Sequence, residues 1–271
     1  MFDDELKVAV IQLSACNDKS KNMAKIEQLL QTDDSKNADL VVLPECCNFR
    51  RLKKEPLQVE QIPGPTTDRI AALAITHQQY ILIGSLLEKS DDSEKAYNTS
   101  VLINPMGDIQ ATYRKIHLFD AHISGVRLFE SDYFLKGETS TIANINNFKV
   151  GFSICYDIRF PELYRYYFKE NVDIICIPSS FTTKTGKDHW DPLCRARAIE
   201  NQSYVLAPNQ YGIGSGRVST YGHSKIIDPW GTILSEEKKN MDSVLTATCS
   251  KKLIMDTRKS MMCKSAITTI N

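Results

Sequence analysis

The feature that most constrains the fold of this chain is the alternation of short apolar segments with amphipathic ones. Apolar, β-branched segments at residues 7–13, 39–43, 80–88, 149–154, 173–178 and 204–209 predict buried strands. Helical spacing of apolar residues at 23–30, 65–77, 161–169 and 189–201 predicts helices between them. Strands that alternate with helices are typical of an α/β fold.

Several turns indicate that the sheets are mixed rather than purely parallel. Residues 95–103 and 109–115 flank an Asn-Pro-Met-Gly-Asp segment with strong turn chemistry, so we expect a β-hairpin there. Further short strands are expected at 222–229, 232–234 and 243–249. No low-complexity linker and no fixed-period repeat divides the chain, so we expect a single domain over residues 1–271.

Composition argues against several classes of function. The 33 basic and 33 acidic side chains give a formal net charge of zero, so no basic surface for nucleic acid is expected. The sequence shows no secretory signal and no bilayer-spanning apolar run, so the cytosol is the expected location, without a membrane partner. The eight cysteines form no C-x-x-C pair and no zinc-like spacing with histidine, which favours reduced thiols over disulfides or a metal site.

Three predicted strands run directly into residues that acyl transfer requires, namely Glu45, Lys115 and Cys155. Sites in α/β proteins commonly form at such strand ends. The thiolate is the nucleophilic form of cysteine, and we expect the start of the helix after Cys155 to favour it. Glu45 would then serve as the base, while Lys115 and the backbone N–H of Tyr156 would stabilise the oxyanion. The three strand ends together therefore predict a cysteine-dependent amidase.

Other interpretations of these segments stay open at this stage. A Cys/His pair is possible, because partners need only be close in space, and the chain has His77, His117, His122, His189 and His223. Residues 151–155 resemble a serine nucleophile elbow, but Cys155 replaces its final glycine. The glycine-rich segment 212–216 lacks the dinucleotide-binding form and is interpreted as a flexible loop. Residues 116–140 show little regular pattern, which is typical of a functional loop.

Three segments resemble the nitrilase, or carbon–nitrogen hydrolase, superfamily: residues 40–46 (LVVLPEC), 113–120 (YRKIHLFD) and 151–165 (GFSICYDIRFPELYR). They occur in the family's order, and the similarity extends from residues 8–13 to 221–231. The resemblance implies a four-layer α-β-β-α sandwich with a Glu–Lys–Cys triad at the residues singled out above. It also implies a homodimer, with helices 161–169 and 189–201 as candidates for the interface, and no metal or organic cofactor.

The resemblance further implies a second glutamate near the site. Glu130, in a Phe-Glu-Ser segment, is the candidate, and Glu138 is the alternative because the loop length varies. Arg159 follows the nucleophile in a segment that resembles the Nit branch, whose members act on small amides bearing carboxylates, and a guanidinium suits carboxylate binding. Ser179 and Phe181 are further candidates for oxyanion or substrate binding.

The expected activity is hydrolysis of a small carboxylate-bearing amide to an acid and ammonia through a thioester on Cys155. Residues 221–224 (YGHS) and 228–231 (DPWG) resemble segments of the deaminated-glutathione amidases, which makes deaminated glutathione the favoured substrate. An ω-amidase acting on α-ketoglutaramate is the alternative. A nitrilase and a non-catalytic binding protein on the same scaffold also stay open.

Overall fold

The computed structural model of the chain describes residues 4–52, 55–91, 94–123, 125–213 and 218–265. Its helices are α1 (Lys19–Leu30), α2 (Asp33–Lys36), α3 (Pro65–His77), α4 (Pro161–Lys169), α5 (Thr183–Asn201) and α6 (Lys251–Met261), with 3-10 helices η1 (Glu130–Asp132) and η2 (Cys155–Arg159).

The strands form two large sheets and two small hairpins. The first sheet has the order β17 (Ser243–Ser250), β1 (Glu5–Gln12), β2 (Leu40–Val42), β3 (Tyr80–Lys89), β4 (Ala96–Ile103) and β5 (Ile109–Arg114), and β8 (Phe134–Leu135) also pairs with β4. The second has the order β16 (Ile233–Glu236), β15 (Lys225–Ile227), β12 (Tyr204–Ala207), β11 (Ile174–Cys176), β10 (Phe148–Phe152) and β9 (Ile142–Ile145). The hairpins are β6 (Asp120–Ile123) with β7 (Val126–Phe129), and β13 (Tyr211–Ile213) with β14 (Ser219–Tyr221).

Both large sheets are mixed, as the sequence predicts. In the first, β1, β2 and β3 are parallel, while β17, β4 and β5 add antiparallel edges. In the second, β10, β11 and β12 are parallel, while β9 and β15 pair with them antiparallel. The central parallel strands are covered on both faces, which explains why their sequences are nearly continuous apolar runs.

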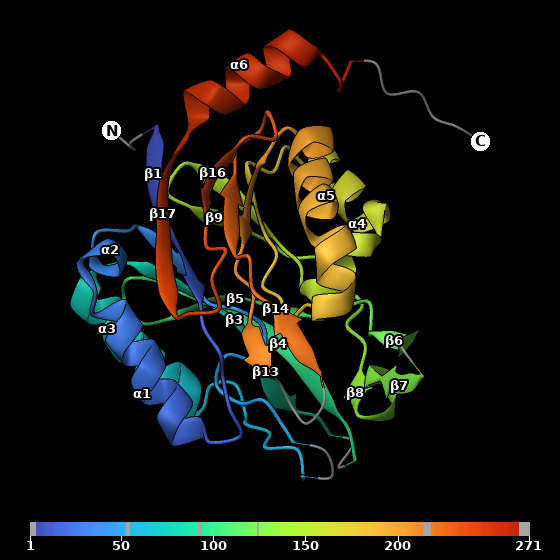
Figure 1. Cartoon of the computed structure of the whole chain (residues 1–271). Helices are drawn as coiled ribbons and strands as arrows, with labels where there is room; N and C mark the ends of the chain where they lie inside the picture. Colours follow the sequence, from blue (N-terminus) through green and yellow to red (C-terminus); the bar gives the residue numbers. More distant parts are fainter. Residues whose placement is uncertain (1–3, 53–54, 92–93, 124, 214–217, 266–271) are drawn as a thin grey trace.

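The two sheets pack face to face between two layers of helices (Figure 1). Side chains alternate along a strand, so Val8 and Val10 of β1 join the core that faces the second sheet. Ala9 and Ile11 point the other way and pack with residues of α1 and α3. On the far side, α4 and α5 cover the second sheet, and Trp190 of α5 is fully buried there. The predicted four-layer α-β-β-α architecture is confirmed.

The structure differs from the expected elements mainly at α5 and in residues 116–140. Helix α5 begins at Thr183 instead of residue 189, since the Thr182 side chain accepts a hydrogen bond from the Thr185 N–H and caps a longer helix. Residues 116–140 hold β6, β7, η1 and β8, whose short strands carry too few residues to show a period. Helix α6 was not predicted, because only Ile254 and Thr257 of its eleven residues are buried.

The structure describes only part of the predicted flexible loop at residues 212–216. Gly212 and Ile213 belong to β13, and residues 214–216 of the predicted flexible loop lie outside the described residues. Within the described ranges, no helix combines the length and apolar character that a membrane crossing requires. The extent of the single domain stays a prediction.

Candidate active site

Glu45 is held just beyond β2 by a close approach of β3. A Cβ on Gly84 of β3 would lie 1.9 Å from the Leu43 carbonyl oxygen, so this crossing requires glycine. The Asn98 amide from β4 donates to Glu45 Oε1 (2.9 Å), and the Gln210 amide donates to the Glu45 carbonyl (2.9 Å). These contacts orient a carboxyl group whose residue is only 3% exposed.

Lys115 is placed in a similar way at the end of β5. Its N–H donates to the Asn98 carbonyl (2.9 Å), and its carbonyl accepts from the Gly137 N–H (2.7 Å). A Cβ on Gly137 would lie 2.1 Å from the Arg114 carbonyl oxygen, so here too only glycine allows the two segments of the chain to pass this closely. The side chain of Lys115 is fully buried and extends toward Glu45.

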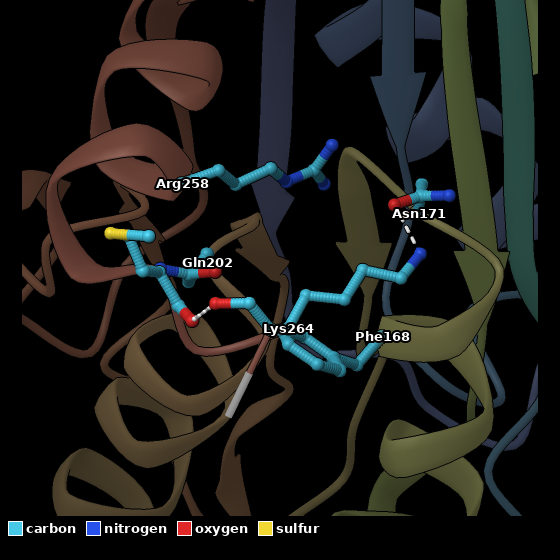
Figure 2. Close-up of a pocket in the computed structure, with 7 residues that line it drawn as sticks. Phe168, Asn171, Gln202, Arg258 and Lys264 are labelled. Atoms are coloured by element: carbon cyan, nitrogen blue, oxygen red, sulfur yellow. Dashed lines mark hydrogen bonds between the residues drawn. The ribbon is translucent and has the colours of Figure 1, made fainter. Parts of the chain in front are cut away.

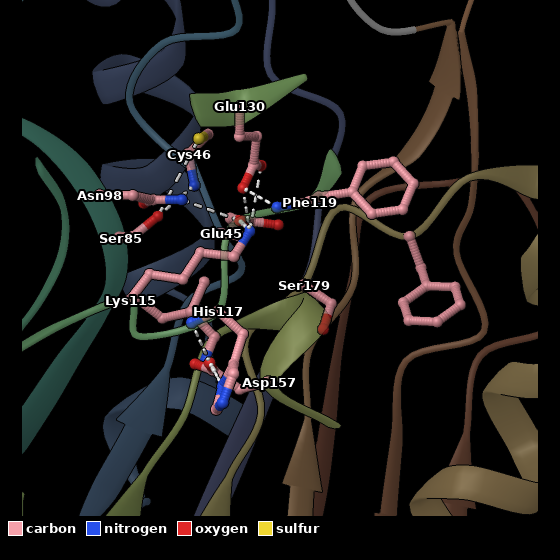
Figure 3. A network of polar contacts seen from close by, with 12 residues as sticks. Glu45, Cys46, Ser85, Asn98, Lys115, His117, Phe119, Glu130, Asp157 and Ser179 are labelled. Carbon is pink, nitrogen blue, oxygen red and sulfur yellow. Dashed lines mark hydrogen bonds and ion pairs between the residues drawn. The ribbon is translucent and has the colours of Figure 1, made fainter. Parts of the chain in front are cut away.

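The Lys115 ammonium lies between two carboxylates, as Figure 3 shows. Its Nζ is 2.9 Å from Glu45 Oε1 and 2.9 Å from Glu130 Oε2. Glu130 opens η1, and its Oε2 also accepts the Phe119 N–H (2.8 Å). Glu138 is exposed, so of the two candidates it is Glu130 that reaches this network.

Burial and charge perturb two groups in this network. Burial disfavours the Lys115 ammonium, but the neighbouring carboxylates of Glu130 and Glu45 outweigh it and raise the pKa of Lys115 well above its usual value. Burial also raises the pKa of Glu130, and the negative charge of Glu45 acts in the same direction, against the opposing effect of Lys115. The single ammonium of Lys115 thus neutralises part of the charge of both Glu45 and Glu130 at a site largely shielded from water.

Cys155 lies on a sharp turn between β10 and η2. Its φ of 48° falls in the left-handed region, which costs a non-glycine residue on the order of 1–3 kcal/mol. The Cys155 N–H donates to the Pro178 carbonyl (2.9 Å), and the Ser180 N–H hydrogen-bonds the thiol. Strained backbone of this kind is characteristic of functional sites, where the surrounding contacts hold it in place.

The thiol of Cys155 is within the electrostatic influence of the whole network. Burial raises its pKa well above the ordinary value, and the charge of Glu45 raises it further, while Lys115 acts to lower it. The expectation that a helix start would favour the thiolate was wrong. Cys155 opens a 3-10 helix of five residues instead of α4, and desolvation dominates.

The residues predicted to bind the oxyanion or the substrate are held by different contacts. The N–H of Tyr156 lies in the first turn of η2, where helix N–H groups have no intrahelical acceptor. Half-buried Arg159 has its guanidinium 5.2 Å from the Phe181 ring centroid and contacts His189 Nδ1 at 3.2 Å. The Ser179 hydroxyl donates to the Ile177 carbonyl (3.0 Å), so it is engaged within its own loop.

Two of the groups that the sequence left open as alternatives, Ser153 and His117, find partners elsewhere. The Ser153 hydroxyl donates to the Cys176 carbonyl (2.9 Å) and accepts from the Tyr164 hydroxyl (2.9 Å), which leaves it in the core. His117 is bound to Asp157 through Nδ1 (2.7 Å). Within the described ranges, no cluster of three His, Cys, Asp or Glu residues is arranged to hold a metal ion.

Sequence reasoning missed Asn98, the Ser180 N–H and Arg50. Arg50 is 7% exposed, and burial lowers its pKa to about 10. The nearby Cys46 and Glu45 act in the opposite direction and raise it. Among the described residues, its guanidinium donates one hydrogen bond, to the Tyr211 carbonyl (3.4 Å). The polar run at residues 98–100 inside a predicted strand was a usable signal, whereas a buried arginine has no signature in sequence.

Known proteins resemble this chain over most of its length. The family model for carbon–nitrogen hydrolases matches residues 7–259. A deaminated glutathione amidase of Synechocystis is 40% identical over 235 residues, which cover 84% of this chain and 86% of that protein. The omega-amidase NIT2 of Xenopus tropicalis is 33% identical over 257 residues, covering 94% and 92%.

Solved structures agree with these matches. The Caenorhabditis elegans NitFhit protein superposes with a TM-score of 0.89 at 32% identity, over 98% of this chain and 66% of that one. Nit3 of Saccharomyces cerevisiae, a member of branch 10 of the nitrilase superfamily, gives 0.80 at 30% identity over 94% of both chains. The resemblance predicted from three motifs is confirmed, and the chain belongs to the carbon–nitrogen hydrolase family, as an enzyme that hydrolyses carbon–nitrogen bonds other than peptide bonds.

Proposed function

We propose that this protein is a cysteine-dependent amidase in which Cys155 is the nucleophile, Glu45 the general base and Lys115 the oxyanion donor. One observation carries the proposal. A fully buried ammonium contacts two carboxylates, Glu45 and Glu130, and all three charges influence the thiol of Cys155, which lies buried on a strained turn. Perturbed titratable groups clustered in this way are typical of functional sites.

The raised pKa of Cys155 explains why a base is needed. At neutral pH the thiol keeps its proton, so the attack requires a group that removes it as the sulfur–carbon bond forms. Glu45 is suited to this role, since its carboxyl group is oriented by Asn98 and shielded from bulk water. Two further donors, Lys115 and the Tyr156 N–H, would then hold the oxygen on which negative charge develops.

The reaction proceeds in two stages. The sulfur of Cys155 attacks the amide carbonyl, Glu45 accepts the thiol proton and passes it to the departing nitrogen, and a thioester remains. The leaving group is ammonia from a primary amide or an amine from a secondary one. Water then gives its proton to Glu45 and attacks the thioester, which releases the acid and restores the thiol. Glu130 supports this cycle by helping to fix the ammonium of Lys115.

We infer that the substrate is a small amide bearing carboxylate groups, with deaminated glutathione as the leading candidate. The name of the Synechocystis relative supports this choice. Two arginines support it chemically: Arg159 beside Phe181, and Arg50, which is buried near Glu45 with few hydrogen-bond partners. An α-ketoglutaramate ω-amidase is the second candidate, since the Xenopus relative carries that name.

A panel of amides tests both statements. Purified protein is incubated with deaminated glutathione, α-ketoglutaramate, a neutral amide and a nitrile, and the acid product is quantified. We expect hydrolysis of the carboxylate-bearing amides, with the highest kcat/KM for deaminated glutathione. Preference for α-ketoglutaramate would establish the second candidate, and activity on the nitrile alone would refute the amidase.

We also propose a cytoplasmic homodimer. Eight free thiols suit a reducing compartment. Helices α4 and α5 cover the outer face of the second sheet and expose large apolar side chains, Tyr166 (43%) and Ile199 (48%). Light scattering during size-exclusion chromatography tests the association, because charged substitutions at both positions should yield monomers. A tagged protein imaged in cells tests the location.

A further inference from the structure

The Asp157 carboxylate is fully buried and accepts hydrogen bonds from two separate segments of the chain. Its Oδ1 accepts the backbone N–H of His117 (2.9 Å) and lies 2.7 Å from His117 Nδ1. Its Oδ2 accepts the Tyr113 hydroxyl (2.7 Å) and the backbone N–H of Ile154 (2.8 Å). Both oxygens are therefore occupied, each by two contacts, at a residue that is 0% exposed.

These contacts lie on both sides of the proposed catalytic residues. Tyr113 and His117 stand two positions before and two positions after Lys115, at the end of β5 in the first sheet. Ile154 immediately precedes Cys155, which follows β10 in the second sheet. The carboxylate thus joins the segment that carries the ammonium to the turn that carries the thiol, across the boundary between the sheets. Figure 3 shows its contact with His117.

The turn at Cys155 requires such support. Its left-handed backbone is unfavourable, and in the 3-10 helix that follows, the Asp157 side chain accepts the Ile154 N–H while the Asp157 N–H donates to the Ile154 carbonyl (3.0 Å). On the other segment, the ring of His117 stacks on Phe160 with centroids 3.7 Å apart and planes 6° from parallel. The stacking limits how far the imidazole can rotate away from the carboxylate.

We propose that Asp157 is a positioning residue for amide hydrolysis, which sets the Cys155 thiol against the Lys115 ammonium by bonding both backbones at once. The inference rests on the proposed role of Cys155 as the nucleophile. Asp157 exchanges no proton with the substrate in this scheme. It acts through the geometry of Cys155 and Lys115, where displacement by about 1 Å is enough to cost roughly 100-fold in rate.

The charge and symmetry of the carboxylate matter, because an amide of equal size cannot replace it. If Asp157→Asn places its NH₂ group at the Oδ2 position, the Ile154 N–H faces another donor. If the amide is turned over, the His117 N–H faces that donor. Either orientation leaves one buried backbone N–H without an acceptor, so one of the two segments must shift.

Asp173 provides a matched control. It is also a buried aspartate, and it accepts hydrogen bonds from the Lys149 backbone N–H (2.9 Å) and the Lys251 ammonium (2.5 Å), but these groups lie near α6 and not among the catalytic residues. Asp173→Asn should therefore lower the melting temperature while leaving kcat of the folded enzyme within about twofold. Its effect represents what a purely structural role would produce.

The experiment compares Asp157→Asn, Tyr113→Phe and Asp173→Asn with the wild type. Each protein is assayed for kcat and KM on the best amide, melting temperature, and the rate at which iodoacetamide alkylates Cys155, followed on its peptide by mass spectrometry. We expect Asp157→Asn to lower kcat about 100-fold with KM within about threefold, and to slow alkylation of Cys155. Tyr113→Phe, which removes a single hydroxyl and should fold, is expected to lower kcat about fivefold.

Two results would overturn the inference. One is a wild-type kcat in folded Asp157→Asn together with wild-type kcat in Tyr113→Phe. The other is a wild-type rate of Cys155 alkylation in folded Asp157→Asn, with only the melting temperature lowered, as for Asp173→Asn. Should the wild type itself show no turnover and no preferential alkylation of Cys155, the proposed function fails instead, and the two failures are thereby distinguished.

Discussion

Two polar regions of this molecule differ in how their charges are satisfied. Around Lys115, one buried ammonium contacts two carboxylates (Figure 3), and the buried thiol of Cys155 is influenced by all three charges. Near α6, a cavity of about 320 Å³ is lined by Phe168, Asn171, Gln202, Arg258, Met262, Lys264 and Ser265 (Figure 2). Among the described residues, each cation here makes at most one ion pair: Lys264 donates to the neutral Asn171 side chain (2.6 Å), and Arg258 donates to the Val172 carbonyl (2.6 Å) and contacts the Asp173 carboxylate (3.3 Å).

The comparison shows that burial and charge, and not the volume of a cavity, decide how strongly a charged side chain acts on its neighbours. In the α6 cavity, Lys264 is exposed, and water screens its charge. In the buried network, the same kind of ammonium changes the titration of its neighbours because little water is present to screen it. Substitutions should therefore have large effects in the first region and small effects in the second.

The largest effect is expected from Cys155→Ala. Removal of the proposed nucleophile should lower kcat by about 10⁵-fold, because the thioester forms on its sulfur. The melting temperature should change little, since the substitution deletes one sulfur atom. Steady-state assays with calorimetry as a control check this outcome. Retention of more than a small percentage of wild-type activity would move the nucleophile elsewhere.

Glu45→Gln should lower kcat by about 10²–10⁴-fold through loss of the base. It should also shift the titration of the thiol, because the charge of Glu45 raises the pKa of Cys155. Without that charge the thiolate forms at lower pH, so the midpoint of alkylation against pH moves down while turnover falls. A midpoint unchanged from the wild type would mean that Glu45 does not act on this thiol.

Lys115→Met should lower kcat by about 10²–10³-fold, as expected for loss of an oxyanion donor. The same change leaves buried Glu45 and half-buried Glu130 without their cation, which should reduce the free energy of unfolding by about 3–5 kcal/mol. Since Lys115 lowers the pKa of Cys155, the midpoint of its alkylation should move up, opposite to Glu45→Gln. Denaturant unfolding and alkylation kinetics provide the two measurements.

Arg159→Met should act on substrate binding alone. Loss of a charge-assisted contact to a substrate carboxylate is expected to raise KM about tenfold or more, with kcat nearly unchanged. The effect should vanish for a neutral amide, which serves as the control. An equal rise in KM for charged and neutral amides would show that Arg159 shapes the site without binding the carboxylate.

The smallest effect is expected in the α6 cavity. Lys264→Ala removes two hydrogen bonds of an exposed side chain, so stability should change by no more than about 0.5 kcal/mol and kcat/KM by less than twofold. Thermal unfolding and the amide assay check both values. A fall in activity comparable to that of Arg159→Met would contradict the contrast between the two regions.

Much of the fold and of the site was predictable from the sequence because it depends on local pattern. Buried strands reveal themselves as apolar runs, so the termini at which Glu45, Lys115 and Cys155 stand could be found directly. The helix bounds at α3 and α4 agree with the expected ones, since proline begins both. The short strands of residues 116–140 were not predictable, because two to four residues cannot establish a period.

Tertiary structure alone decided how those residues act on one another. The sequence determined which side chains stand at strand ends, but only the folding of the first sheet and of the segment that holds η1 brought Lys115 within 2.9 Å of both Glu45 and Glu130. It also buried Cys155 and reversed the expected direction of its pKa, because desolvation depends on everything that surrounds a group in space. Sequence pattern records the neighbours along a strand, whereas burial and long-range charge depend on neighbours that the chain reaches only by folding.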